Sequence, residues 1–397
     1  MDFALNEPLE RLRERVRAFV ETHVLPAEAR IIEEDRAGDD TTLRALQDRA
    51  REEGLWVPHL PPELGGQGLG PMGMAVAFRE MGRSLVGPRV FNCDAPDQGN
   101  MDLLCAVATP AQRARYLEPL VEGRITSGFS MTEPAPGAGA DPSNLRTRAR
   151  RDGDGWVLDG HKWYTTGGGR AAFLIVMART SDEPRTGATL FLVDRDAPGV
   201  EHVRDIETMS EPLLAHREAE IRFHGVRLGP DAVLGEVGQG FALAQRRLVP
   251  ARLTHCMRWL GLGDRALEAC RDYVQRRTSF GRPLAEHQQI QVMIARAVTD
   301  LHAGNLMTLH CAWMLERGLE REARVYSSMT KTHVARAFLA VLDDAIQMHG
   351  GLGISRDAPF GDWYRAMRPA RIVDGPDEVH VMLVAREWLA GRVRCLW

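Results

Sequence analysis

The chain has 397 residues, 44% hydrophobic and 26% charged, with 50 basic residues against 54 acidic ones and a net charge of −4. This length predicts two or three domains, and the near balance of charge provides no attractive field for nucleic acid or an anionic membrane. No apolar run approaches membrane-spanning length, and the mixed charges of residues 1–17 resemble neither a signal peptide nor a transit peptide. We therefore expect no nucleic acid and no membrane among its partners.

The cysteines and histidines predict neither disulfides nor a metal site. The six cysteines, from Cys93 to Cys395, are scattered without a C-x-x-C pair, and the 13 histidines form no H-x-x-x-H or H-E-x-x-H pair. Scattered thiols are typical of a reducing compartment. We therefore expect a cytoplasmic protein with reduced cysteines and no metal ligands.

Residues 1–124 have the pattern of a helical N-terminal domain. Apolar residues recur at three- and four-residue spacing over 9–24 and again over 43–50, which predicts two amphipathic helices. A third helix is expected over about 72–85. A capping threonine and a first-turn proline begin a fourth helix, which we expect over about 109–121.

Residues 125–236 have the pattern of a small antiparallel β domain. The turn Asp152-Gly153-Asp154-Gly155 lies between two β-type runs and predicts a hairpin. Further short β-type runs are separated by turn residues, at 173–178, 189–193 and 221–223. These features are typical of a barrel or sandwich.

Residues 237–397 return to helices, which are long. Segments are predicted over about 243–276, with Pro250 as a kink, and over about 286–315 and 326–349. A final helix begins near Asp377, and four such helices with short links indicate a bundle. The predicted fold class is therefore α+β, with a helical domain, a β-barrel or sandwich, and a four-helix bundle in chain order.

Three acids gather near the end of the chain, at Asp374, Asp377 and Glu378, around the pair Gly375-Pro376. Pro376 suits the first position of a helix, and Asp377 and Glu378 then lie in its first turn, where the helix dipole favours anions. Asp374 is left on the preceding loop, where a proton-transferring carboxylate could be positioned. The alternative is that all three acids serve only to cap the helix.

Three other stretches have residues suited to holding a flat, phosphorylated ligand. Residues 129–134 place the hydroxyl of Thr132 before a loop of small residues, although such a stretch is also typical of a domain linker. Residues 160–169 combine aromatics, threonines and glycines that can pack on a ring, or simply form a strand and its turn. Residues 276–283 supply arginines for a pyrophosphate, or a solvated basic loop. Neither a nicotinamide-type G-x-G-x-x-G after a strand nor a P-loop is present.

Together these stretches resemble the acyl-CoA dehydrogenases, over essentially the whole chain. Met131-Thr132-Glu133-Pro134 resembles the family's flavin loop, and Lys162 to Gly168 resembles its K-x-W-I-T-N-G strand. Arg277 to Gly281 resembles the R-x-x-F-G turn, and Gln347 to Gly353 resembles the Q-x-x-G-G-x-G segment. Residues 91–101 and 374–380 are further similar to one branch, that of acyl-CoA dehydrogenase family members ten and eleven.

The resemblance implies FAD as cofactor and a subunit interface that completes its site, hence a homodimer or homotetramer. At the flavin, the resemblance implies contacts from Phe129, Met131 and Thr132 to the pyrimidine ring. Tyr164, in place of the family's tryptophan, would lie near the isoalloxazine, and Thr166 near N5. Arg277 and Phe280 would reach the pyrophosphate and adenine of the FAD in a neighbouring subunit, and Gln347, Gly350 and Gly351 would contact the same cofactor across that interface.

The same resemblance implies a reaction. Asp374 matches the catalytic glutamate, which removes the α-proton of an acyl-CoA while the β-carbon gives hydride to flavin N5. The product is a trans-2-enoyl-CoA, and the electrons pass to an electron-transfer flavoprotein, as in fatty acid β-oxidation. Ser130, Arg252 and Gly375 match positions that contact the substrate.

The chain departs from the family at several positions. Asp374 is one carbon shorter than glutamate, about 1.5 Å. The position of the family's alternative base is Ala251, which cannot act as one, and Ala140 stands where a CoA-contacting serine is common. Rival interpretations are an acyl-CoA oxidase that uses dioxygen, a non-catalytic nucleic-acid-binding flavoprotein of the same fold, and a flavin-free scaffold. The branch hints at longer or hydroxylated acyl chains.

Overall fold

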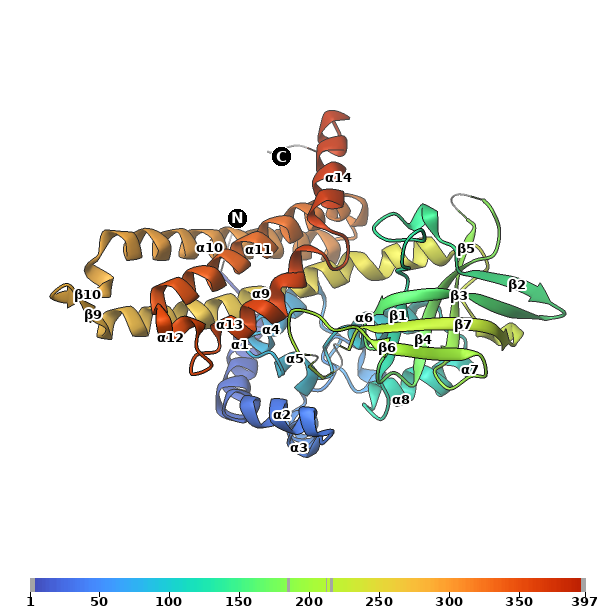
Figure 1. Cartoon of the computed structure of the whole chain (residues 1–397), viewed down its shortest axis with the longest axis horizontal. Helices are drawn as coiled ribbons and strands as arrows, with labels where there is room; N and C mark the ends of the chain where they lie inside the picture. Colours follow the sequence, from blue (N-terminus) through green and yellow to red (C-terminus); the bar gives the residue numbers. More distant parts are fainter. Residues whose placement is uncertain (1–3, 184–185, 212, 215–216, 394–397) are drawn as a thin grey trace.

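The computed structural model of the protein describes residues 4–183, 186–211, 213–214 and 217–393. In Figure 1 the N-terminal helices lie below, the β-sheet lies to the right, and the long C-terminal helices extend to the left. The predicted order of helices, sheet and helices is therefore confirmed. Cys395 lies outside the described residues.

Eight short or medium helices make up the first region. Each apolar stripe that predicted a helix becomes a buried face: Val16 and Phe19, for example, pack into one core with Phe78 and Phe91. The helix start at Thr109 is confirmed, because Thr109 and Gln112 form a reciprocal capping box. The elements are α1 Glu7–Phe19, α2 Leu25–Ala37, α3 Thr41–Glu52, α4 Pro71–Met81, α5 Gly87–Val90, α6 Asp97–Val107, α7 Pro110–Gln112 and α8 Glu118–Val121.

The second region is an eight-stranded sheet in the order β6-β7-β3-β2-β4-β5-β8, with β1 beside β4. It is mainly antiparallel as predicted, except that β1 runs parallel to β4 and β2 meets β4 in parallel at one residue pair. The strands are β1 Ser127–Ser130, β2 Arg148–Asp152, β3 Gly155–Thr165, β4 Phe173–Arg179, β5 Ala188–Asp194, β6 Val200–Asp205, β7 Ala219–Leu228 and β8 Val233–Leu234. The continuous apolar run of β4 follows from burial on both faces, since Phe173 and Ile175 enter one core and Leu174 and Val176 another.

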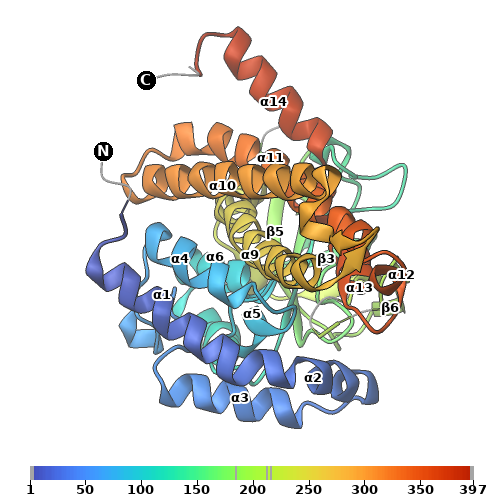
Figure 2. The same ribbon diagram turned by 90° about the vertical axis from the view of Figure 1, so that its left-hand side faces the viewer.

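Three long helices dominate the third region: α9 Gly240–Arg276, α10 Gln288–Glu316 and α11 Glu320–His349. Pro250 lies inside α9, which continues through it. The hairpin of β9 Thr278–Ser279 and β10 Arg282–Pro283 joins α9 to α10, and the short helices α12 Gly351–Ile354 and α13 Phe360–Met367 follow α11. The last helix, α14 Asp377–Leu389, is shorter than its three partners in the predicted bundle and projects beyond them in Figures 1 and 2.

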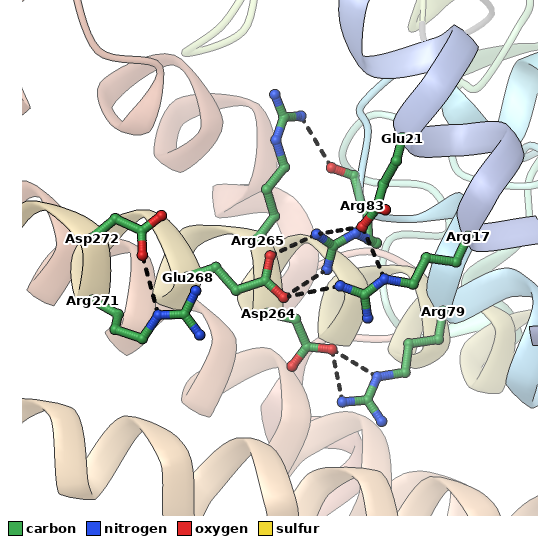
Figure 3. Close-up of polar contacts among 9 residues, drawn as sticks. All are labelled: Arg17, Glu21, Arg79, Arg83, Asp264, Arg265, Glu268, Arg271 and Asp272. Carbon is green, nitrogen blue, oxygen red and sulfur yellow. Dashed lines mark hydrogen bonds and ion pairs between the residues drawn. The ribbon is translucent and has the colours of Figure 1, made fainter. Parts of the chain in front are cut away.

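The first region is fixed to the third where α4 packs on α9. The two backbones approach so closely that a Cβ at Gly261 would lie 1.9 Å from the carbonyl oxygen of Arg79. Ion pairs flank this crossing, with Arg83 2.6 Å from Glu268 and Arg79 2.7 Å from Asp264 (Figure 3). This crossing lies just past the middle of α9, and the active-site candidate Arg252 lies on the N-terminal side of it. Within the described residues, no helix is long and apolar enough to cross a membrane.

Candidate active site

The loop before α14 presents Asp374 in a strained conformation. Asp374 has a φ of 53° and Gly375 one of 102°, a left-handed region that favours glycine and tolerates aspartate better than most residues. The carbonyl oxygen of Asp374 accepts from Arg252 Nε at 2.9 Å and lies 3.2 Å from His380 Nε2. Lys331, which is fully buried, donates to the Gly375 carbonyl at 2.8 Å. Contacts to two successive carbonyls therefore determine the orientation of Asp374.

Asp377 anchors the same loop from the other side. We expected Asp377 in the first turn of this helix, and it is there. Its side chain is 1% exposed, and its Oδ2 accepts from Arg336 at 3.0 Å and Arg371 at 2.7 Å. Pro376 is the N-cap, one residue before the position predicted for it, and Asp377 is the first helical residue. Burial disfavours the charge of Asp377, but the hydrogen bonds from the two arginines outweigh it and lower its pKa.

The Asp374 carboxylate lies beside a histidine and faces two arginines. Its Oδ2 is 3.3 Å from His255 Nε2, and the side chain is 18% exposed. Burial alone would raise the pKa of Asp374, but His255 and the charges of Arg247 and Arg252 hold it well below its usual range. Asp374 is therefore ionised at neutral pH, as a base must be.

The segment 91–101 reaches this site from the first region. Asn100 Oδ1 accepts from Arg247 Nε at 2.8 Å, and the Arg247 guanidinium lies 4.1 Å from the centre of the Phe129 ring. Arg258 donates to the carbonyl of Cys93 at 2.7 Å. This stretch, which the sequence singled out without a role, therefore links α9 to the loop predicted to contact the flavin.

A buried ion pair shapes that loop. Glu133 accepts from Lys162 at 2.9 Å, from Thr147 N at 2.8 Å and from Arg146 N at 2.7 Å. Lys162 also donates to the carbonyl of Met131 at 2.9 Å. Burial alone would raise the pKa of Glu133. Lys162 and Thr147 have a larger, opposite effect, and together they lower the pKa to about 2. This carboxylate therefore ties together the loop and β3, the two segments predicted to face the ring.

The residues predicted to contact the flavin ring or the substrate differ in whether their side chains are free to bind a ligand. The hydroxyl of Thr132 makes no hydrogen bond within the described part of the chain, whereas that of Thr166 donates to Glu218 at 3.0 Å. Tyr164 is 47% exposed and has a φ of 47°. Ser130 is fully buried, with its hydroxyl 2.9 Å from that of Thr165, so only its backbone remains for a substrate.

The other predicted cofactor residues lie elsewhere. The remaining residues lie at the far end of α9 from the sheet, in the β9–β10 hairpin and where α11 passes into α12 (Figure 1): Arg277, Phe280, Gln347, Gly350 and Gly351. Phe280 is 96% exposed. The α9 helix of 37 residues is about 55 Å long at 1.5 Å per residue. The structure therefore joins Asp374 to Arg252 and joins Phe129 of the loop to Arg247 on the same helix, and it places this second set apart.

The two sets fit the two ends of a flavin dinucleotide. On β3 and the loop before it there is an exposed aromatic ring and an unused hydroxyl, as a flat heterocycle requires. At the far end the side chains of Arg277 and Gln347 have no hydrogen-bond partner among the described residues, and Gly350 and Gly351 have open space beside them. These are groups that a phosphorylated ligand can occupy.

Sequence reasoning missed Arg247, His255, Arg258 and Lys331. Charged residues in long helices are usually solvated, so these four were not singled out. The available signal was the spacing of Arg252, His255 and Arg258, which places three basic residues on one side of a helix at three-residue intervals.

Three family models match the sequence in succession. They are the acyl-CoA dehydrogenase N-terminal domain over residues 6–124, the middle domain over 128–226, and the C-terminal domain over 238–389.

Individual relatives give the same result. The probable acyl-CoA dehydrogenase FadE2 of Mycobacterium tuberculosis is 39% identical, over 98% of this chain and 97% of its own. Acyl-CoA dehydrogenase family member 11 of Gallus gallus is 36% identical over 94% of this chain, which spans only 49% of that longer protein. A structure of a proposed acyl-CoA dehydrogenase from Mycobacterium abscessus superposes with a TM-score of 0.92, at 37% identity over 98% of this chain and 100% of its own.

Proposed function

The chain belongs to the acyl-CoA dehydrogenase family and is an FAD-dependent oxidoreductase, and from this premise we propose that it converts a fatty acyl-CoA thioester to the trans-2-enoyl-CoA with Asp374 as the base. One observation carries the proposal. Asp374 is a largely buried, ionised carboxylate on a loop whose carbonyls are held by Arg252 and Lys331, and it faces Arg247, whose guanidinium lies over the Phe129 ring. FAD, when bound, supplies the hydride acceptor.

The protein's own groups account for the proton removal. The α-proton of a thioester is acidic only when the thioester oxygen is polarised by hydrogen-bond donors. The backbone N–H groups of Asp374 and Gly375 make no hydrogen bond within the described chain, which leaves them available to that oxygen. Asp374 and Gly375 both have a positive φ, so one short loop supplies the carboxylate and these backbone N–H donors. In the proposed reaction the carboxylate of Asp374 then takes the α-proton.

The shorter base is compatible with this role because its backbone is fixed. Contacts from Arg252, His380 and Lys331 hold the carbonyls of Asp374 and Gly375. The missing carbon of about 1.5 Å then requires the acyl chain to lie nearer the loop than it would for glutamate. Arg252 Nε positions the base through the Asp374 carbonyl, and a contact of its guanidinium with the substrate stays a prediction.

An assembly of two or more copies completes the proposed cofactor site. Thr132 and Tyr164 lie near one end of α9 and Arg277 and Phe280 near the other, so both sets reach one FAD only when it lies between two subunits. A side chain exposed as fully as Phe280 is the kind of residue a neighbouring subunit covers. We propose a homodimer or homotetramer on this basis.

We further propose that an electron-transfer flavoprotein accepts the electrons, and that the protein works in the cytoplasm in fatty acid oxidation. The five cysteines in the described residues are all free thiols, in keeping with a reducing compartment. The acyl chain remains to be identified, with longer or hydroxylated chains as the first candidates.

Anaerobic titration of the yellow protein tests this function. Butyryl-, octanoyl-, palmitoyl-, isobutyryl- and 4-hydroxyoctanoyl-CoA are added in turn and the loss of flavin absorbance is followed. We expect at least one thioester to bleach the flavin and to yield its trans-2-enoyl product, and slow reoxidation when air is admitted. Rapid reoxidation would identify an oxidase instead, and no bleaching by any thioester would overturn the proposed reaction.

A further inference from the structure

One turn of α9 beyond Arg252 lies a histidine that the proposed reaction leaves without a role. His255 Nε2 is 3.3 Å from Asp374 Oδ2, and the other ring nitrogen, Nδ1, is 3.2 Å from Arg258 Nη2. The ring is stacked on Trp259, with centroids 5.4 Å apart and planes inclined by 17°. Arg258, His255 and Asp374 therefore form a line that ends at the base.

The partner of Nδ1 determines where the imidazole proton lies. A guanidinium has five N–H donors and no acceptor, so a ring nitrogen that it contacts must accept. Nδ1 is then unprotonated and the neutral ring carries its proton on Nε2, which faces Asp374. This tautomer directs the proton of Nε2 towards Oδ2 of Asp374, 3.3 Å from Nε2, a buried oxygen that has no well-aligned hydrogen bond among the described residues and that a small rotation of the ring would satisfy.

Arg258 is itself fixed by the first region. It is 8% exposed, and its Nη1 donates to the carbonyl of Cys93 at 2.7 Å. The α4 helix also ends against it, because a Cβ at Gly82 would lie 2.4 Å from the Arg258 backbone. The guanidinium can therefore turn away from His255 only by losing its bond to the Cys93 carbonyl.

We propose that Arg258 and His255 are positioning residues for the proton transfer: Arg258 fixes the Nε2–H tautomer, and His255 donates to Oδ2 of Asp374, leaving Oδ1 for the proton of the substrate. This inference rests on the proposed dehydrogenation. His255 is not itself the proton acceptor, because accepting at Nε2 would require a proton on Nδ1 facing Arg258. His255 therefore positions the carboxylate and does not relay the substrate's proton.

The pH dependence of the reaction follows from the groups around the base. Besides the neutral ring of His255, Asp374 faces the charges of Arg247 and Arg252 on α9 and of Lys331 on α11. It also faces His380 on α14, whose pKa burial lowers to about 4, and Asp94 faces Arg258. The rate requires an ionised carboxylate, so it falls as the pH drops through the pKa of Asp374. Because His255 helps to lower that pKa, its removal moves the fall in rate to higher pH.

Rapid mixing of the FAD-loaded enzyme with the acyl-CoA that bleaches it fastest tests the kinetic part. His255→Phe keeps a ring on Trp259 but removes the donor, whereas His255→Gln replaces the donor with an amide. We expect the rate of flavin reduction to fall about tenfold to a hundredfold in His255→Phe, with its acid limb moved to higher pH, and to be partly restored in His255→Gln. Equal losses in both variants with an unmoved pH profile would overturn the positioning role.

Solid-state 15N NMR of the histidine-labelled holoenzyme tests the tautomer without any turnover. The difference spectrum between the wild type and His255→Gln isolates the ring. We expect a protonated Nε2 and an unprotonated Nδ1 at pH 8, a shifted Nε2 signal in Asp374→Asn, and mixed tautomers in Arg258→Met. A proton on Nδ1, or an imidazolium, would overturn the proposal. If no acyl-CoA bleaches the flavin, the proposed function fails while this spectrum still decides the Arg258–His255 contact.

Discussion

At the scale of single residues, the site depends on charges that are buried together. Asp374 and Glu133 are both carboxylates whose burial opposes ionisation and whose cationic partners outweigh that burial. Asp374 faces solvent-accessible space with one oxygen near His255, whereas Glu133 is enclosed by Lys162 and backbone N–H groups. Asp374 is therefore suited to proton transfer, whereas Glu133 is suited to holding two segments of the fold together.

Glu133 and Lys162 allow a prediction about stability. Glu133→Gln leaves Lys162 buried without its counter-charge, so we expect a loss of about 3–5 kcal/mol at pH 7, seen as a lower melting temperature. The pKa of Glu133 is lowered from 4.5 to about 2, so its contribution is complete above pH 4.5 and is lost as the pH falls towards 2. The difference between variant and wild type should shrink over that range.

Asp182→Asn is the matched control, because Asp182 is 84% exposed in its pair with Arg148. We expect no measurable change there. A Glu133→Gln protein as stable as the wild type at pH 7 would show that Lys162 does not need its partner.

At the scale of elements, the long helix α9 connects the regions. It begins against β5, where a Cβ at Gly240 would lie 2.7 Å from the Thr189 backbone, and it crosses α4 at Gly261. It also carries Arg247, Arg252, His255 and Arg258. Displacement of α9 would therefore alter the site, and we expect mutations at its crossing with α4 to affect the enzyme as a whole.

The ion pairs at that crossing can be tested separately from the apolar contact. Arg83→Met removes a guanidinium that is 6% exposed and leaves Glu268 without its close partner, so we expect a loss of about 1–3 kcal/mol and a melting temperature lower by several degrees. Arg271→Met is the control from the same helix, since Arg271 and Asp272 are 63% and 56% exposed (Figure 3). Equal effects of the two substitutions would contradict a special role for the buried pair.

Much of this arrangement could be predicted from the sequence, for physical reasons that differ between elements. The β2–β3 hairpin was predicted because Asp152 to Gly155 has turn chemistry, and α9 because its apolar spacing is long and regular. Strand β6 was missed because it lies at the edge of the sheet, where Val200 to Asp205 is only partly buried and lacks a clear alternation.

The site was only half predictable for a similar reason. Asp374 stood out by its loop beside a Gly-Pro pair, and Thr132 by its family-like motif. The roles of His255 and Lys331 depend on which distant segments α9 and α11 meet, here the loop before α14. Local patterns contain no information about such contacts between segments far apart in the sequence.

At the scale of the whole molecule, the separation of the two cofactor-facing sets predicts an assembly. Phe280 lies at the tip of the β9–β10 hairpin, where it is 96% exposed in one chain and covered in the proposed oligomer. Phe280→Asp places a charge at this tip. We expect weaker FAD retention and a shift towards smaller species by light scattering after size-exclusion chromatography, with secondary structure unchanged.

Met209→Asp is the comparison for that experiment, because Met209 is also an exposed apolar residue, 60% accessible, on a segment beside α2. It should leave both FAD content and oligomeric state as they are. If Phe280→Asp kept the size and FAD content of the wild type, the shared cofactor site would be wrong.

The central claim is that Asp374 removes the α-proton, and single-turnover flavin reduction in Asp374→Asn tests it most directly. Asparagine keeps the size of the side chain but cannot accept the proton. With the acyl-CoA that reduces the wild type, we predict a rate at least about a hundredfold lower, while FAD content and acyl-CoA binding are retained. Flavin reduction at the wild-type rate in Asp374→Asn would contradict the account and require another base.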